Sequence, residues 1–169
     1  MTVYDFSYTK ITMETITDQP TMLAPTFLTA GNATFTADNG KGKHYTFKVR
    51  QAPVDVEHPT RTRPFFVSLL AGPDNTADYV YMGLLVGSAK RNTLEVRLTK
   101  ASTYPLNSVP VKVLEFVLRV MQDKQAMPEG YQIRHMGACG MCGRPLTEPE
   151  SLECGIGPIC REKMAGGAS

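Results

Sequence analysis

The chain has 169 residues, of which 42% are hydrophobic and 20% are charged, and its formal net charge at pH 7 is +2. These proportions are typical of a globular protein and argue against a disordered one. A chain of this length can bury one ordinary core of about 100 to 130 residues and carry a small metal-stabilised segment beside it. No apolar run approaches the roughly 18 residues that a membrane-spanning helix needs, so we expect no membrane association.

The first residues of the chain contain no basic segment followed by an apolar one, so nothing in them is typical of a secretion signal. We therefore expect a cytoplasmic protein, in which cysteines stay reduced. Residues 1–25 are predicted to be an extension that precedes the folded domain.

Residues 26–100 have the pattern of a β-sheet. An alternating run at 33–37, a turn at 38–40 and a second alternating run at 45–49 together predict a hairpin with apolar residues on one face. Further strands are expected at 64–70, 78–86 and 93–98. The sequence thus predicts a mostly antiparallel sheet of five strands.

From Val109 to Lys124 the polar and apolar residues recur every three or four positions, which predicts an amphipathic helix. The simplest arrangement packs this helix on one face of the sheet and leaves the other face available. A last strand, Tyr131 to His135, would connect the sheet to the C-terminal segment. The predicted class is α+β, with an α+β domain at 26–130, a metal-binding module at 131–165 and a disordered tail at 166–169.

Positive charge is concentrated in the predicted sheet, because residues 41–100 hold ten lysines and arginines against five acidic residues. In the expected registers these side chains form a basic surface, with Tyr79 and Tyr81 as platforms on which unpaired bases can stack. The alternative is an ordinary solvated face with half-buried tyrosines. The candidate nucleic-acid-binding residues are Lys41, Lys43, Lys48, Arg50, Lys90, Arg91 and Arg97.

All four cysteines lie near the C-terminus, as Cys139-x2-Cys142 and Cys154-x5-Cys160. A structural zinc ion takes four such ligands in a tetrahedron, and a Cys-x2-Cys pair on a tight turn supplies two adjacent corners. Disulfides would need an oxidising compartment, so we do not expect them in a cytoplasmic protein. A redox Cys-x2-Cys pair usually opens a helix, whereas the flanking glycines here indicate a turn. We therefore predict a Zn²⁺ site, with redox chemistry and inert buried thiols as the alternatives.

The residues between the ligands predict two short helices, one from Glu148 to Glu153 that Gly155 ends, and one from Pro158 to Met164. The second helix would place Cys160 in its first turn, which gives a treble-clef-like module. The x5 spacing of the last pair is wide, so the fourth ligand has two candidates. Cys154 completes a four-cysteine set, and His135 is the alternative to it.

The run from Cys139 to Ser151, followed by Gly155-Ile156-Gly157-Pro158-Ile159-Cys160, resembles an uncharacterised zinc-finger-like family of bacteriophage and actinobacterial proteins. The family pattern is roughly CxxCGRxLTxPES followed by GIGPxC, and the resemblance covers about the last 30 residues. It implies zinc binding and a phage or mobile-element setting, hence a bacterial host cytoplasm. In this family the position of Cys154 is commonly not cysteine and a histidine near the position of His135 is common, which favours the alternative ligand.

No nucleophile with a base, Walker loop or dinucleotide fingerprint is present in the sequence, and a zinc ion closed by four cysteines cannot activate water. We therefore expect a protein that is not an enzyme. The main hypothesis is an accessory factor that binds nucleic acid through the basic sheet face. The alternative is a protein-interaction module or inhibitor of a host protein, in which the zinc site is purely structural. The oligomeric state is left open.

Overall fold

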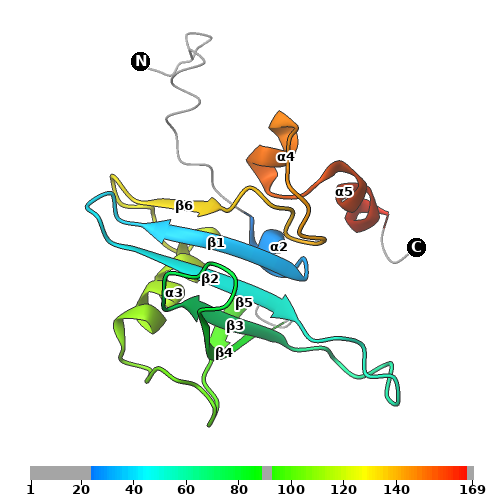
Figure 1. Cartoon of the computed structure of the whole chain (residues 1–169), viewed down its shortest axis with the longest axis horizontal. Coiled ribbons are helices and arrows are strands. Elements are labelled where there is room, and N and C mark those ends of the chain that lie inside the picture. The colour runs from blue at the N-terminus through cyan, green and yellow to red at the C-terminus, as the bar shows by residue number, and fades with distance from the viewer. Residues whose placement is uncertain (1–23, 89–92, 167–169) are drawn as a thin grey trace.

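A computed structural model describes residues 24–88 and 93–166 of the chain. It contains a mostly antiparallel sheet with several helices (Figure 1). The sheet has six strands, in the order β5-β4-β3-β2-β1-β6. These strands are β1 (Asn32–Asp38), β2 (His44–Gln51), β3 (Phe65–Leu70), β4 (Tyr79–Ser88), β5 (Thr93–Arg97) and β6 (Gln132–His135).

The prediction of five strands is therefore wrong by one strand. The segment Gln132–His135, expected only as a connection to the C-terminal module, pairs antiparallel with β1 and becomes a full member of the sheet. It can do so because the first hairpin leaves the outer edge of β1 free to form backbone hydrogen bonds. The consequence is that the cysteine-rich segment starts directly from the sheet edge.

The helices are α2 (Pro25–Leu28), α3 (Val109–Met121), α4 (Pro149–Cys154) and α5 (Pro158–Ala165). The predicted amphipathic helix is present as α3 and ends three residues earlier than expected, because Asp123 adopts a positive φ of 59°. Among the described residues, no helix is long and apolar enough to cross a membrane.

Apolar side chains of α3 and of the strands share one core. The register of β1 and β2 places Phe35 opposite Phe47, and their rings stack with centroids 5.4 Å apart. Val111, Leu114 and Val117 of α3 are buried in the same core. We call the sheet face that α3 covers the core face, and its opposite the outer face.

The end of α3 is tied to the free edge of β5 by one side-chain amide. Gln122 accepts a hydrogen bond from the Leu94 backbone N–H at 2.8 Å and donates one to the Leu94 carbonyl at 3.1 Å. The amide thus takes the place of a neighbouring strand at one residue of this edge.

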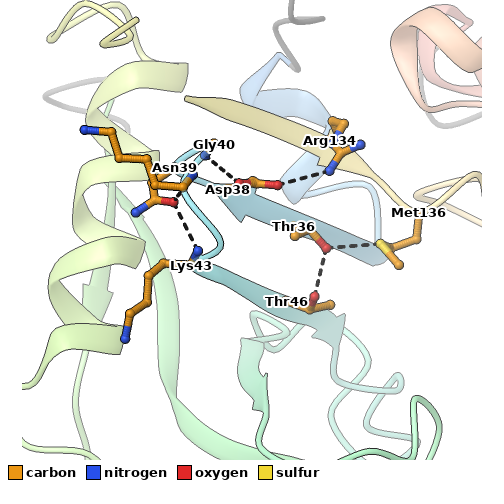
Figure 2. A network of polar contacts seen from close by, with 9 residues as sticks. Thr36, Asp38, Asn39, Gly40, Lys43, Thr46, Arg134 and Met136 are labelled. Carbon is orange, nitrogen blue, oxygen red and sulfur yellow. Dashed lines mark hydrogen bonds and ion pairs between the residues drawn. The ribbon is translucent and has the colours of Figure 1, made fainter. Parts of the chain in front are cut away.

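At the other edge, polar contacts reinforce the pairing of β6 with β1 (Figure 2). Arg134 forms an ion pair with Asp38 at 3.4 Å. Thr36 of β1 contacts both neighbouring segments. Its hydroxyl is 2.8 Å from that of Thr46 in β2, and it donates to the sulfur of Met136, which follows β6, at 3.2 Å. These contacts fix where the chain leaves the sheet and enters the C-terminal module.

Candidate metal centre

Cys139 and Cys142 lie on a tight turn that follows β6. The turn is closed by an antiparallel bridge between Ala138 and Pro145 and by a hydrogen bond from the Cys139 N–H to the Arg144 carbonyl at 2.8 Å. Gly143 has a φ of +80°, which an L-residue adopts only at a cost. The turn therefore holds the two thiols on one side, as a metal-binding knuckle requires.

Cys160 comes from the first turn of α5. Gly157 precedes the helix and Pro158 occupies its first position, where the missing backbone N–H has no consequence. The sulfur atoms of Cys139, Cys142 and Cys160 all lie within 4.8 Å of one another. In a tetrahedron with zinc–sulfur bonds of about 2.3 Å the sulfur atoms are roughly 3.8 Å apart, so a small contraction would suffice for metal binding.

The surroundings of the two buried thiols differ. Burial disfavours a Cys139 thiolate, but backbone N–H groups of Gly157, Cys142 and Met141 stabilise it and together lower the pKa of this thiol to about 7. Two of these N–H groups lie 3.3 Å (Gly157) and 3.4 Å (Met141) from the sulfur. Burial, followed by hydrogen bonding within the cluster and the neighbouring negative charge, raises the pKa of Cys160 to about 11. The N–H groups aimed at Cys139 are those that support a metal-bound thiolate.

Cys154, expected as the fourth ligand, is not part of this group. It is the last residue of α4, and its half-buried sulfur lies 3.4 Å from the Ile156 carbonyl and 3.9 Å from the Ser151 carbonyl. Gly155 follows as the residue that ends the helix, as expected, with a φ of +77°. The structure thus brings together three of the four predicted cysteines and leaves the fourth outside the cluster.

His135, the alternative fourth ligand, is not in the group either. Its Nδ1 accepts a hydrogen bond from the Gly137 N–H at 2.9 Å, so the proton belongs on Nε2, which contacts the Leu152 carbonyl. Both ring nitrogens are therefore engaged with the backbone. In this arrangement the imidazole joins the end of β6 to α4.

The cysteine-rich segment packs against Phe27 of α2, a residue that the sequence analysis did not single out. A Cβ atom added to Gly140 or to Gly155 would lie 2.8 Å from the Phe27 ring, so both glycines allow a close approach. The Asn32 N–H also donates to the Gly140 carbonyl at 2.6 Å. The only signal in the sequence for this contact is a pair of glycines, each of which directly follows a cysteine.

We expect Gly155→Ala to destabilise the protein more than Gly42→Ala does. Both glycines have positive φ, which costs roughly 1–2 kcal/mol for alanine, but Gly42 has no atom within 4 Å of an added Cβ. The new methyl group at Gly155 would also collide with Phe27. Chemical denaturation of both variants measures the difference, and equal losses would show that contact with Phe27 is unimportant.

The predicted basic residues do not form one patch. Lys48 and Arg50 of β2 and Arg97 of β5 lie on the outer face. Lys41 and Lys43 lie in the β1–β2 turn, where both backbone N–H groups donate to the Asn39 side chain. Figure 2 shows the contact of Lys43 with Asn39. Lys90 and Arg91 fall outside the described residues.

The outer face also carries the two predicted tyrosines. Tyr79 and Tyr81 of β4 face Leu70 and Ser68 of β3, and the Lys48 Nζ lies 3.7 Å from the centre of the Tyr79 ring. Phe66 of β3 is 40% exposed and meets Tyr81 edge-on, with centroids 6.2 Å apart. Alternation along the sequence does not mark Phe66 as an outward residue, because its neighbours on both sides are apolar too.

Residues 132–165, from β6 to α5, match a family of unknown function, DUF6011. The matched residues include the cysteine motif whose resemblance to an uncharacterised family is described above. No curated protein and no solved structure matches the chain.

Proposed function

We propose that this protein binds a zinc ion through its C-terminal cysteines, and that it binds an unpaired strand of nucleic acid through the outer face of its sheet. It acts by binding and not by catalysis, as an accessory factor of a phage or mobile element in a host cytoplasm; that setting rests on the resemblance of the cysteine motif alone. The observation that carries the nucleic-acid part is the juxtaposition of cations and aromatic rings on one face.

Zinc is the metal that best fits the donor set. Three thiolates on a tight turn and a helix N-terminus are soft ligands at the spacing of structural zinc sites. Three thiolates also give a dipositive ion a net charge of about −1, which weakens it as a Lewis acid for activating water. This charge favours a structural or ligand-binding role over hydrolysis.

The outer face has the two features that non-specific binding of single strands needs. Lys48 and Arg50 lie beside each other, and burial together with the Arg50 charge lowers the pKa of Lys48. A phosphate would relieve this like-charge repulsion. Phe66 is exposed, while Tyr79 and Tyr81 are half-buried and the Lys48 ammonium lies over the Tyr79 ring, so ring surface and cations meet on this face. Base–aromatic stacking contributes about 1–3 kcal/mol per base.

We expect Tyr79→Ala to weaken binding of a single-stranded oligonucleotide about 5- to 150-fold, and Lys48→Ala to reduce the salt dependence by about 0.7 in log–log slope. Fluorescence anisotropy at several salt concentrations measures both effects. Lys112→Ala is the matched control, because Lys112 is an exposed lysine on α3, on the opposite side of the sheet. The absence of binding at low salt, or an equal effect of the control, would contradict the proposal.

One observation favours protein binding as a second function. The helices of the cysteine-rich segment expose apolar side chains, with Leu152 42%, Ile159 60% and Met164 37% accessible. Exposed apolar side chains contribute to partner recognition where they form a contiguous patch. If the nucleic-acid test fails, capture of a host protein that is lost in Ile159→Ser would support this alternative.

A further inference from the structure

Every cysteine and histidine of this chain, the residues that usually bind zinc, can be located in the structure. The sequence has four cysteines and three histidines, and all seven lie among the described residues. His44 begins β2 and is exposed, and the ring of His58 contacts Asp55, in the connection between β2 and β3. Neither histidine belongs to the cysteine cluster.

The two nearer candidates are held in other contacts. The Cys154 sulfur faces the carbonyls of Ser151 and Ile156, and both ring nitrogens of His135 form hydrogen bonds with the backbone. Among the described residues, no carboxylate oxygen joins the three sulfur atoms within 4.8 Å either. A tetrahedral ion held by the three sulfurs would thus have one coordination position that no described side chain of this chain fills.

That position has room for an outside ligand. The three cysteines line a hollow of about 390 Å³, together with Thr147, Glu148 and Lys163. Cys142 is exposed to solvent, so the cluster can be reached from the surface. The space is many times the roughly 30 Å³ that one water molecule occupies, and a side chain can enter it.

We propose that the metal ion has an exchangeable fourth position, which holds water in the free protein and takes a thiolate or an imidazole from outside the chain. The inference rests on the proposed zinc binding and deepens it. Either donor would complete a common structural set, four cysteines or three cysteines with one histidine. In the exchange the incoming sulfur or nitrogen lone pair forms the new bond to the metal, water leaves, and an incoming thiol releases its proton to solvent.

X-ray absorption of the zinc-loaded protein tests the ligand set directly. We expect three sulfur ligands and one oxygen ligand, and the same set in Cys154→Ser. His135→Gln should likewise keep one zinc per chain. Four sulfurs in a monomeric wild-type sample that fall to three in Cys154→Ser would overturn the inference while leaving zinc binding intact. A protein that binds no metal would instead overturn the proposed zinc function.

Exchange is tested on the cobalt-substituted protein, whose visible spectrum reports its ligands. Addition of imidazole or of 2-mercaptoethanol should shift the ligand-field bands and saturate, and 2-mercaptoethanol should increase the thiolate-to-cobalt charge-transfer absorption by about one third, from three sulfurs to four. A spectrum that neither reagent changes would overturn the inference. Size-exclusion chromatography tests whether a second copy of the chain is the donor: zinc-dependent dimers that imidazole dissociates would place a second copy at this position instead of water, and a monomer would agree with water there in the free protein.

Discussion

Replacing Cys139 with serine is expected to abolish stoichiometric metal binding and to unfold the segment from Gly137 to Gly166. Cys139 is fully buried, and its sulfur accepts hydrogen bonds from the backbone N–H of Met141 in the turn and from that of Gly157 before α5. Structural zinc contributes about 10–16 kcal/mol in small zinc-binding modules, which exceeds what packing alone can replace in a segment of this size. Elemental analysis and limited proteolysis measure the two losses.

The matched control for this experiment is Cys154→Ser, because Cys154 is the only other cysteine of the segment that stands apart from the cluster. It should keep one metal per chain and a protease-resistant segment. If Cys139→Ser retains its protease resistance without metal, the cluster is not what holds the segment together. A chelator added to the wild-type protein should reproduce the effect of Cys139→Ser.

Replacing Phe27 with alanine is expected to lower the free energy of unfolding by about 3–5 kcal/mol, the usual cost of truncating a fully buried phenylalanine. The ring is 1% exposed and lies against Gly140 and Gly155, with its centre 6.1 Å from that of His135. Its loss would remove an apolar contact between α2 and the cysteine-rich segment. Denaturant unfolding monitored by far-UV circular dichroism measures the change.

Zinc content separates this effect from that of the cysteine substitution. Phe27→Ala touches no sulfur ligand, so the variant should keep its metal while it loses stability. Phe66→Ala is the control for removing a phenylalanine from a partly exposed position, and it should cost about 1 kcal/mol. A loss of metal in Phe27→Ala, or equal destabilisation by the two substitutions, would contradict this assignment.

The strands and α3 were predictable because their signals are local. Phe47 and Val49 alternate with polar residues and lie on the core face, and the periodicity of 109–124 gives the helix within three residues of its end. The sixth strand was placed correctly along the chain, but its pairing with β1 was not predicted. Pairing between segments about a hundred residues apart leaves no local pattern in either of them.

The candidate site was predictable only in part, for a similar reason. The Cys-x2-Cys turn and Cys160 at the start of a helix follow from spacing and from helix-start residues. The direction of the Cys154 sulfur depends on how α4 ends at Gly155, and the engagement of His135 depends on where Leu152 lies in space. The role of Phe27 could not be seen because its partners are glycines, which have no side chain to mark a contact.

The position of β1 between β2 and β6 has a consequence for synthesis on the ribosome. The hairpin partner of β1 follows after a short turn, but Gln132, which pairs with Asp38, emerges 94 residues later (132 − 38). At 5–20 residues per second the outer edge of β1 waits roughly 5–20 s for its partner. Throughout that interval the nascent chain exposes an unpaired strand edge to other nascent chains and to chaperones, until arrival of the C-terminal segment covers it.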